Sequence, residues 1–407
     1  MANTLKFGAG EWATKKGSTL AYNSENGNFK PLPFTFDRST SATRVNKEGL
    51  IEVVSNNEPR IDFLNDSNGA LLLEPTRSNL VTYSEDFSQS VWSTWQSTKT
   101  LSNNINPKGT NGYYEISHTG SSTDNPNTRL RDVSLNGSYT LSSFIKINQS
   151  RYISLAIEDY DGDRARVYFD TINKTFTTVG NVGSPITNTS YSEFPNGWIR
   201  ISLSVNLLNA VYNEVAIGIY NPSGSLPPAS GEFISVFGVQ LEQGSYATSY
   251  IPTQGGIGTR VAERCSQTPT SGIIGQTEGT IFLESNNLYP SGTRTLGMLY
   301  TSGSAFYQIY LTSSNQVRID INGVLLFLSS SITVNTKNKI AFSYKSGENV
   351  LYINGNQIAV SSSTSIPSSL NSFHLGNFNG NEQSGSFTKA QLYNTRLSNA
   401  ELAALTS

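Results

Sequence analysis

The chain has 407 residues, a formal net charge of -2 and only 14% charged residues. This length predicts two or three domains, and the near-zero net charge argues against nucleic acid or an anionic membrane as a main partner. The single cysteine, Cys265, rules out an intrachain disulfide framework and a thiolate metal site, and the presence of only two histidines rules out a multi-histidine zinc site. Ser, Thr, Asn and Gly replace the missing charges, which is typical of an extracellular or particle-surface β protein.

No apolar run reaches the roughly 18 to 20 residues of a membrane span, and the first residues lack the apolar stretch of a secretory signal. We therefore expect the protein to stay in the cytoplasm of the cell that makes it. A surface-type composition without an export signal suits a particle that is assembled inside a cell and released by lysis.

Residues 1–80 predict an extended N-terminal arm. Its apolar residues come in short bursts, such as Phe34 with Phe36, separated by turn formers. Arginines are spaced along the same stretch, at Arg38, Arg44, Arg60 and Arg77. We interpret residues 1–80 as the attachment and oligomerisation region, with the apolar bursts and arginines available for docking.

Residues 81–254 carry strand patterns that predict an antiparallel β-sandwich. In Tyr152 to Asp170, apolar alternation flanks Asp161-Gly162, a dipeptide that favours a type I′ turn, so a β-hairpin is expected there. Residues 255–275 are rich in Gly, Thr and Ser and predict a linker.

A second series of strands occupies residues 276–407. Asn322-Gly323 and Asn354-Gly355 lie within apolar alternation and predict two tight hairpins. Ser398 with Glu401 predicts a capping box and a short C-terminal helix. The fold class expected for the whole chain is all-β: an extended arm followed by two antiparallel jelly-roll sandwiches.

Between Gly279 and Leu405 the chain contains KIAFSYKSGENVLYINGNQIA, followed by AQLYNTRLS running into a helix that begins SNAEL. In the order and spacing of these segments it resembles a concanavalin A-like or laminin-G-like jelly roll. The resemblance implies two curved antiparallel sheets, which in many such domains bind glycans.

From about Gly10 to Glu263 the chain contains a series of blocks in this order: GEWATKKGSTLAYN, FTFDRSTSATRVNKEGLIE, NEPRIDF, LLLEPTRSNL, YSEDFSQSVW, GVQLEQGSYATSYIPT and GTRVAE. In these blocks the chain resembles structural proteins of tailed-phage virions, namely fibre, collar and capsid-decoration proteins. The resemblance implies a virion-surface location, contacts with other virion proteins through the N-terminal region, and a homo-oligomer, for which we expect a trimer. It also implies that the sandwich between the blocks is similar to carbohydrate-binding modules.

The densest acidic cluster is EDYDGDR. Asp159, Asp161 and Asp163 have the spacing of the first ligands of a calcium loop, but Arg164 stands where such loops need Gly. We favour a solvated hairpin turn over calcium. No cofactor is expected.

No nucleophile-and-base motif or HExxH motif is present, and the two histidines fall in different predicted domains. We expect His118 to be an exposed loop residue and His374 to lie at a satisfied core edge. Paired carboxylates cannot be recognised from sequence, so catalysis is disfavoured without being excluded, and no catalytic residue is assigned.

Glycan binding by a sandwich needs exposed aromatic faces with polar groups beside them. Trp92 and Trp95 are the best candidates, and the Asn377, Phe378 and Asn379 loop is a second candidate. The alternative is that one or both tryptophans fill the edge of the core.

The sequence therefore favours a non-enzymatic virion structural protein that displays glycan-binding sandwiches toward cell-surface or mucosal glycans. A polysaccharide-degrading enzyme with accessory carbohydrate-binding modules is one alternative. A decoration protein that stabilises the shell without a ligand is another.

Overall fold

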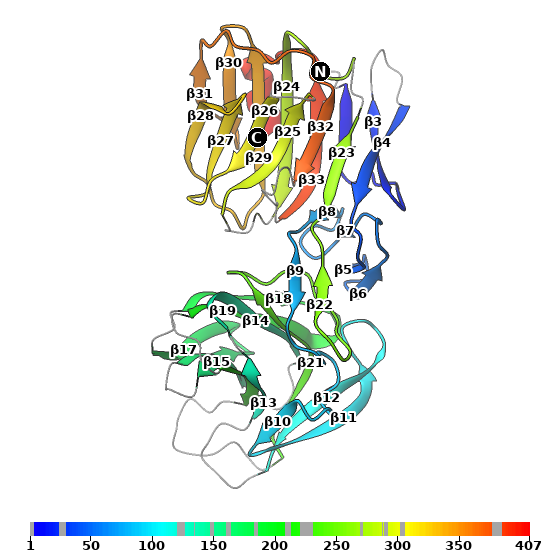
Figure 1. The fold of residues 1–407 in the computed structure, drawn as a ribbon, viewed down its shortest axis with the longest axis vertical. Helices are drawn as coiled ribbons and strands as arrows, with labels where there is room; N and C mark the ends of the chain where they lie inside the picture. The colour runs from blue at the N-terminus through cyan, green and yellow to red at the C-terminus, as the bar shows by residue number, and fades with distance from the viewer. Residues whose placement is uncertain are drawn as a thin grey trace. The chain divides into compact units, whose positions relative to one another are not determined.

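The computed structural model describes residues 4–23, 30–119, 127–133, 135–146, 150–159, 164–182, 186–207, 213–219, 231–268, 272–286, 288, 292–301, 306–376 and 385–407. The chain forms two compact units. Unit 1 combines residues 1–47, 53–76 and 261–407, and unit 2 combines residues 48–52 and 77–260 (Figure 1). The all-β prediction is confirmed, and among the described residues no helix is long and apolar enough to cross a membrane.

Unit 1 contains strands from both ends of the chain. These strands are β1 Leu5–Gly8, β2 Thr14–Lys15, β3 Ser18–Asn23, β4 Lys30–Asp37, β5 Ala42–Val45, β7 Ile61–Asp62, β8 Ala70–Leu73, β23 Arg264–Gln267, β24 Glu278–Asn286, β25 Arg294–Tyr300, β26 Phe306–Leu311, β27 Gln316–Ile321, β28 Val324–Ser331, β29 Asn338–Lys345, β30 Asn349–Ile353, β31 Asn356–Ser361, β32 Ser372–Gly376 and β33 Gly385–Tyr393. Strand β6, Ile51–Val54, crosses the boundary between the units.

Two antiparallel series of strands face each other in unit 1. One runs β28-β27-β26-β25-β32-β23-β4-β3, and the other runs β31-β30-β29-β24-β33-β1. Strand β1 pairs with both β3 and β33, so the N-terminal strand joins the two series at one side of the sandwich. Strand β8 pairs with β33 beside it.

The separate N-terminal arm expected at residues 1–80 is therefore not what the structure shows. The apolar bursts belong to the core of unit 1, where Phe34, Phe36 and Leu71 are fully buried. Two of the arginines assigned to docking, Arg38 and Arg60, are also buried, with 1% and 0% of their surface exposed. Phe34, Phe36 and Leu71 pack against strands from residues 261–407. This packing covers apolar surface that residues 276–407 alone would expose to water.

The predicted linker also forms strands. Strand β22, Gly258–Arg260, pairs with β9, Arg77–Asn79, and strand β23 pairs with both β4 and β32. Residues 255–275 thus contribute pairing to both units, although residues 269–271 lie outside the described part.

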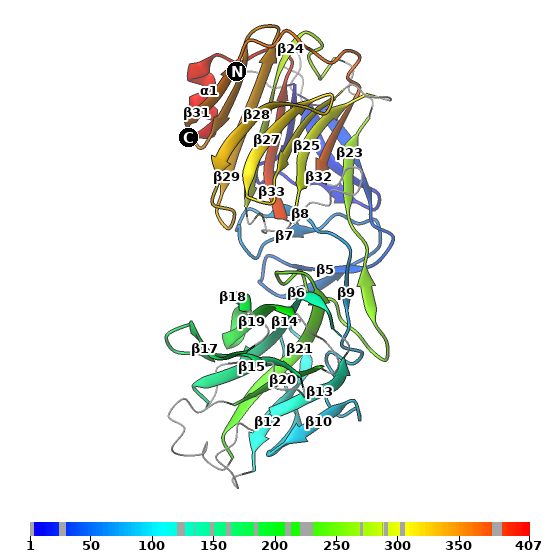
Figure 2. The same cartoon turned by 60° about the vertical axis from the view of Figure 1, so that its left-hand side comes forward.

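The local predictions for unit 1 are confirmed. Asn322 and Gly323 have φ angles of 50° and 80°, and Asn354 and Gly355 have φ angles of 48° and 82°, as a type I′ turn requires. Helix α1, Asn399–Thr406, starts from a complete capping box between Ser398 and Glu401 and contacts β29, β30 and β31 (Figure 2).

Unit 2 is a sandwich of two six-stranded antiparallel sheets. Its strands are β9, β10 Trp92–Trp95, β11 Ser97–Ile105, β12 Asn111–His118, β13 Asn127–Val133, β14 Gly137–Lys146, β15 Tyr152–Asp159, β16 Arg164–Asp170, β17 Thr175–Val182, β18 Ile186–Glu193, β19 Trp198–Leu207, β20 Asn213–Ile219, β21 Phe233–Gln243 and β22. One sheet has the order β10-β13-β20-β15-β16-β17, and the other has the order β11-β12-β21-β14-β19-β18.

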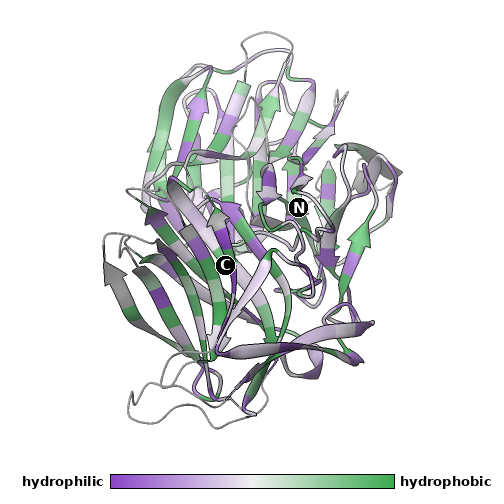
Figure 3. Cartoon of the chain, turned by 60° about the horizontal axis from the view of Figure 1, so that its bottom comes forward, coloured by the Kyte–Doolittle hydropathy of each residue, from purple (hydrophilic) through white to green (hydrophobic). Residues whose placement is uncertain are grey.

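The core of unit 2 follows from alternation along these strands. Ile153, Leu155 and Ile157 of β15 are fully buried between the sheets, and the intervening residues face outward. The same alternation of apolar and polar residues runs along the strands in Figure 3. Strands β15 and β16 pair as the predicted hairpin, whose turn at Asp161-Gly162 lies outside the described residues.

Candidate functional site

The outward face of the β10–β17 sheet of unit 2 gathers aromatic and charged side chains. Register places two parallel rows of residues across this face. One row contains Trp95, Asn127, Gly218, Ser154 and Tyr168, and the next contains Ser93, Arg129, Ala216, Ala156 and Arg166. We call this surface the Trp95 face, and it also includes Arg131, Glu158 and Glu214.

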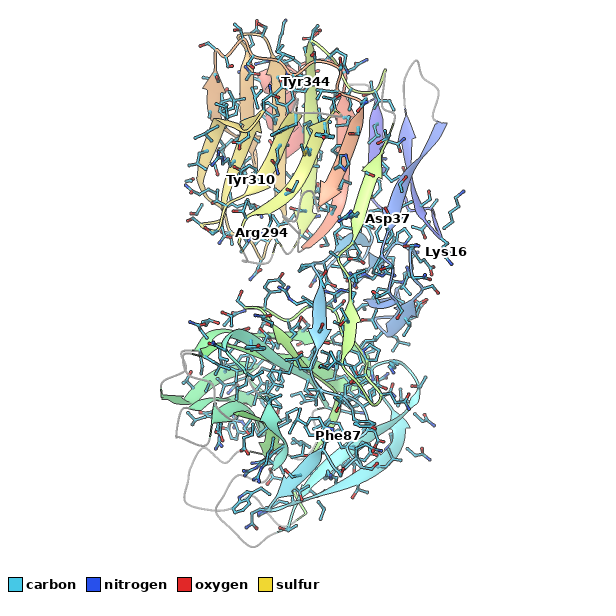
Figure 4. The ribbon with its side chains drawn as sticks, viewed as in Figure 1. Lys16, Asp37, Phe87, Arg294, Tyr310 and Tyr344 are labelled. Atoms are coloured by element: carbon cyan, nitrogen blue, oxygen red, sulfur yellow. The ribbon has the colours of Figure 1, made fainter. Side chains whose placement is uncertain are left out.

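The two tryptophans that the sequence suggested for glycan binding differ in their burial. Trp92 is 2% exposed, stacks on Phe87 with ring centroids 4.7 Å apart, and donates its indole N–H to the Tyr83 carbonyl at 2.8 Å. Figure 4 marks Phe87 within this unit. Trp95 is 43% exposed. Three residues apart in a strand, the two rings point to opposite faces of the sheet, so Trp92 belongs to the core and Trp95 to the outer surface.

An arginine holds Trp95 in place. The Arg129 guanidinium lies 5.2 Å from the centre of the Trp95 ring. The same guanidinium donates to Asn127 Oδ1 at 2.5 Å and to Glu214 Oε1 at 3.0 Å. Burial lowers the pKa of Arg129, whereas Glu214 acts in the opposite direction. The Trp95 ring therefore lies beside the Arg129 guanidinium, which hydrogen bonds to Asn127 and Glu214 also hold in place.

Two glutamates of the Trp95 face, Glu158 and Glu214, each form an ion pair with arginine. Glu214 Oε2 also forms an ion pair with Arg131 Nε at 3.2 Å, and Glu158 Oε1 contacts Arg166 Nη2 at 2.6 Å. Glu158 and Glu214 are direct cross-strand neighbours on β15 and β20. They form a fixed set of hydrogen-bond donors and acceptors that faces outward.

Small residues separate the aromatic ends of the Trp95 face. Ala156, Ala216 and Ser154 are 1%, 4% and 4% exposed although they point outward, because the longer side chains around them cover them. Trp95 on β10 and Tyr168 on β16 are four strand spacings apart, or roughly 19 Å at about 4.8 Å per spacing. The face therefore has small residues in its middle, Trp95 toward one side, and Tyr168 packed against Tyr152 toward the other.

The other predicted site residues are not brought to this face by any described contact. Asn377, Phe378 and Asn379 lie outside the described residues, as do Asp161 and Asp163. Asp159 ends β15, and its side chain is not described. Among the described residues, no group of three His, Cys, Asp or Glu could hold a metal ion.

The prediction for His118 is wrong. It is 3% exposed at the end of β12, because the strand extends further than the sequence suggested and the ring shares the inward parity of Ile116. His374 lies in β32, is half-buried, and contacts Ser372 Oγ at 3.2 Å, in agreement with a satisfied core edge. Burial lowers the pKa of His374.

Sequence reasoning missed Arg129, Glu158, Arg166 and Glu214. The signal in the sequence is the set of residues between the apolar positions of each strand. RYISLAIED and NEVAIGI place apolar residues at every other position, so the residues between them point to the opposite face of the sheet. The outward parity of each strand would have marked these residues as facing away from the core, but it would not have shown that they lie together, because that depends on which strands are neighbours.

Comparison with known proteins supports the fold of the C-terminal part. Residues 282–403 match the laminin-G type of the concanavalin A-like lectin/glucanases superfamily. No curated protein sequence matches the chain.

Solved structures show only a loose similarity. The CBM40 module of Ruminococcus gnavus IT-sialidase, bound to α2,3 sialyllactose, is 18% identical, with 34% of this chain and 86% of that chain covered and a TM-score of 0.31. Domain 4 of the arabinanase AbnA from Geobacillus stearothermophilus, in complex with arabinotriose, is 15% identical, with 40% and 83% covered and a TM-score of 0.31. Trypanosoma rangeli sialidase in complex with sialic acid is 12% identical, with 96% and 66% covered and a TM-score of 0.31. At these scores the similarity carries no conclusion about ligand or activity.

Proposed function

We propose that the protein is a non-enzymatic structural protein of a phage virion, which displays glycan-binding sandwiches on the particle. The observation that carries glycan binding is the Trp95 face. Its exposed Trp95 ring offers a stacking surface for the apolar side of a sugar, and its paired Arg and Glu side chains offer donors and acceptors for hydroxyl groups. The virion location rests on the ordered sequence blocks described above.

The width of the Trp95 face favours an oligosaccharide over a single sugar. An oligosaccharide that crosses the small residues Gly218 and Ser154, which lie in the same row as both aromatic residues, reaches from Trp95 toward Tyr168. Many copies on one particle would make weak individual contacts useful, because avidity raises the effective concentration without any new contact.

The test of glycan binding compares Trp95→Ala with Leu101→Ala on a glycan array and by affinity electrophoresis. Leu101 is 61% exposed on β11, a strand of the other sheet, so its variant removes exposed apolar surface without touching the Trp95 face. We expect Trp95→Ala to reduce retention about tenfold and Leu101→Ala to leave it unchanged. No retention of the wild-type protein on any glycan would favour a decoration protein without a ligand.

Self-association is the second part of the proposal. Strands β28 and β31 contact each other, and within the described residues each has a strand partner on one side only. They expose Val324 by 70%, Leu328 by 46% and Val360 by 65%, and neither VLLFLSSS nor NQIAVS contains a charge or a proline. The occupant that fits is the same edge of a second copy, because identical uncharged strands do not repel each other and can satisfy each other's open backbone groups.

Light scattering during size exclusion tests this part. The wild-type protein should elute as an oligomer, and Val324→Lys with Val360→Lys should shift it toward monomer. Val53→Lys is the control, since Val53 is also exposed but lies elsewhere in unit 1. A monomeric wild type, or an oligomer that survives both substitutions, would remove this edge from the assembly.

The enzyme alternative has one observation in its favour. Glu158 and Glu214 are direct cross-strand neighbours, a placement that puts Cβ atoms about 4.5 to 5.5 Å apart and suits a pair of carboxylates in glycoside cleavage. Against it, arginines contact both carboxylates, and a general acid must carry a proton that a neighbouring guanidinium opposes. New reducing ends after incubation with capsule or mucin glycans, abolished by Glu158→Gln, would favour the enzyme.

A further inference from the structure

A pocket lies on the other sheet of unit 2, which contains β12, β14 and β21. It has a volume of about 490 Å³, and its lining includes Tyr113, Glu115, Lys146 and Phe233. This volume falls within the roughly 300 to 1,000 Å³ of small-molecule sites. The pocket shares no lining residue with the Trp95 face, so it is a separate site.

Strand register builds the pocket. Glu115 of β12 and Lys146 of β14 both pair with Ser235 of β21, so they stand on either side of the same central residue. Ser235 is small and fully buried, and the two longer side chains on either side of it line the pocket. The two charged residues are two strand spacings apart, or roughly 10 Å between their Cα atoms at about 4.8 Å per spacing.

The two charges are not used elsewhere. No hydrogen bond or ion pair joins Glu115 or Lys146 to any described side chain, although other charged residues of this unit, such as Arg129 with Glu214 and Arg151 with Asp170, are paired. A carboxylate and an ammonium group therefore face one pocket from opposite sides and remain available to a ligand.

The remaining walls are aromatic and amide groups together with the aliphatic side chain of Ile105. Tyr113 is held edge-on against Trp198, with ring centroids 5.1 Å apart, and Phe233 is half-buried. Asn196 has a φ angle of 61° in the turn before β19, a backbone conformation that asparagine tolerates better than most residues. Asn104 adds a second amide. Aromatic walls with amides suit the apolar face and the hydroxyl groups of a sugar ring.

We infer that this pocket binds a zwitterionic amino sugar, a sugar unit that bears both an amino group and a carboxylate. The carboxylate lies toward Lys146, the amino group lies toward Glu115, and the ring lies against Phe233 and Ile105, since Tyr113 is only 4% exposed. A sugar with only one charge leaves the other protein charge without a partner, so the pocket discriminates against it.

Calorimetry on the full chain tests the inference with three probes. Muramic acid carries both charges, glucosamine carries only the amino group, and glucuronate carries only the carboxylate. We expect muramic acid to bind about tenfold more tightly than either of the others, because each correct charge adds a charge-assisted hydrogen bond. Its affinity should fall as the salt concentration rises.

Two variants test which pocket residue binds each charged group of muramic acid. Lys146→Met should reduce binding of muramic acid to the level of glucosamine, and Glu115→Gln should reduce it to the level of glucuronate. Lys174→Met and Glu193→Gln are the matched controls, since this ion pair lies outside the pocket. Both control variants should bind muramic acid as the wild type does.

Equal affinity for the three probes, or binding of muramic acid that survives both pocket variants, would overturn the inference. Trp95→Ala should leave muramic acid binding intact. Failure of this pocket and failure of the Trp95 face are therefore distinguishable in the same set of proteins.

Discussion

Arg60 and Glu263 form a fully buried, two-pronged ion pair within unit 1. Arg60 Nε lies 2.6 Å from Glu263 Oε1, and Arg60 Nη2 lies 2.5 Å from Glu263 Oε2, although 203 residues separate them in sequence. Glu263 Oε1 also accepts from Arg38 at 2.9 Å, and Arg60 Nη1 donates to Glu74 at 2.9 Å. Burial alone would lower the pKa of Arg60, but Glu263 and Glu74 raise it above its ordinary value.

Glu263→Gln is expected to destabilise unit 1 by about 3 to 5 kcal/mol. The substitution leaves two buried guanidinium groups, those of Arg38 and Arg60, with one fewer charge to balance them. Chemical denaturation followed by far-UV circular dichroism measures the loss.

The control for Glu263 is Lys345→Met in the same unit. It breaks a long surface contact with Glu278, at 3.8 Å, and should change stability by less than about 1 kcal/mol. A Glu263→Gln protein as stable as Lys345→Met would contradict the structural role of the buried pair.

The N-terminal strands are expected to be necessary for the C-terminal sandwich. A fragment of residues 261–407 loses β1 and β8 beside β33, loses β4 beside β23, and exposes the core that Phe34 and Leu71 cover. We expect it to lack a cooperative unfolding transition and the amide dispersion of a folded β domain in NMR spectra. Co-expression with residues 1–76 should restore both.

A point substitution tests the same conclusion in the intact chain. Phe34→Ala should cost about 3 to 5 kcal/mol, because Phe34 is fully buried and packs 4.9 Å from the Phe7 ring. Val53→Ala, at a residue that is 57% exposed, should cost almost nothing.

The fragment experiment has a clear contrary outcome. If the 261–407 fragment unfolds cooperatively at the same denaturant midpoint as the full-length protein, the N-terminal strands are dispensable.

The arginines explain what sequence could and could not predict. Arg38 and Arg60 look like docking residues in sequence, because arginine is almost never fully buried unless it is paired. Their carboxylate partner, Glu263, lies near the other end of the chain, in a stretch that sequence alone presented as a linker. Local signals, such as the Asn354-Gly355 turn, needed no distant partner and were predicted correctly.

The same distinction applies to the Trp95 face. Alternation along β15 predicts that Glu158 faces away from the core, because side-chain direction is a local property. Its position opposite Glu214 depends on β15 pairing with β20, a strand that lies far away in sequence. Sequence could predict that polar faces exist, and it could not predict which residues share one.

Trp92 and Trp95 should respond in opposite ways to truncation. Trp92→Ala removes a ring stacked on Phe87 and an indole hydrogen bond, so unit 2 should lose about 3 to 5 kcal/mol of stability. Trp95→Ala removes an exposed ring and should cost less than about 1 kcal/mol, which is the size of its contact with Arg129. Urea denaturation of the two variants measures the difference. A large loss for Trp95→Ala would show that its ring supports the fold, and a change in glycan retention could then not be assigned to direct contact.

Asp170 should make unit 2 sensitive to acid. Its carboxylate accepts Arg151 Nη2 at 2.7 Å and the backbone N–H groups of Ile172 and Asn173 at 2.9 and 3.1 Å. The hydrogen bonds from Arg151, followed by those from the backbone, lower the pKa of Asp170 to about 2 from 3.8. A carboxyl group whose pKa is lower in the folded state stabilises the protein above the unfolded value. Its contribution is therefore complete above pH 3.8 and is lost as the pH falls toward about 2.

Asp170→Asn removes the titrating group and tests this sign. The variant should be less stable than the wild type at neutral pH, and the difference between them should shrink as the pH falls from 3.8 toward about 2. Thermal unfolding at a series of pH values measures the difference. Glu11→Gln is the control, because Glu11 is an exposed carboxylate in unit 1, in a surface pair with Lys6 at 3.0 Å. A stability difference between wild type and Asp170→Asn that stays constant through this range would show that the Arg151 contact contributes nothing to the acid response.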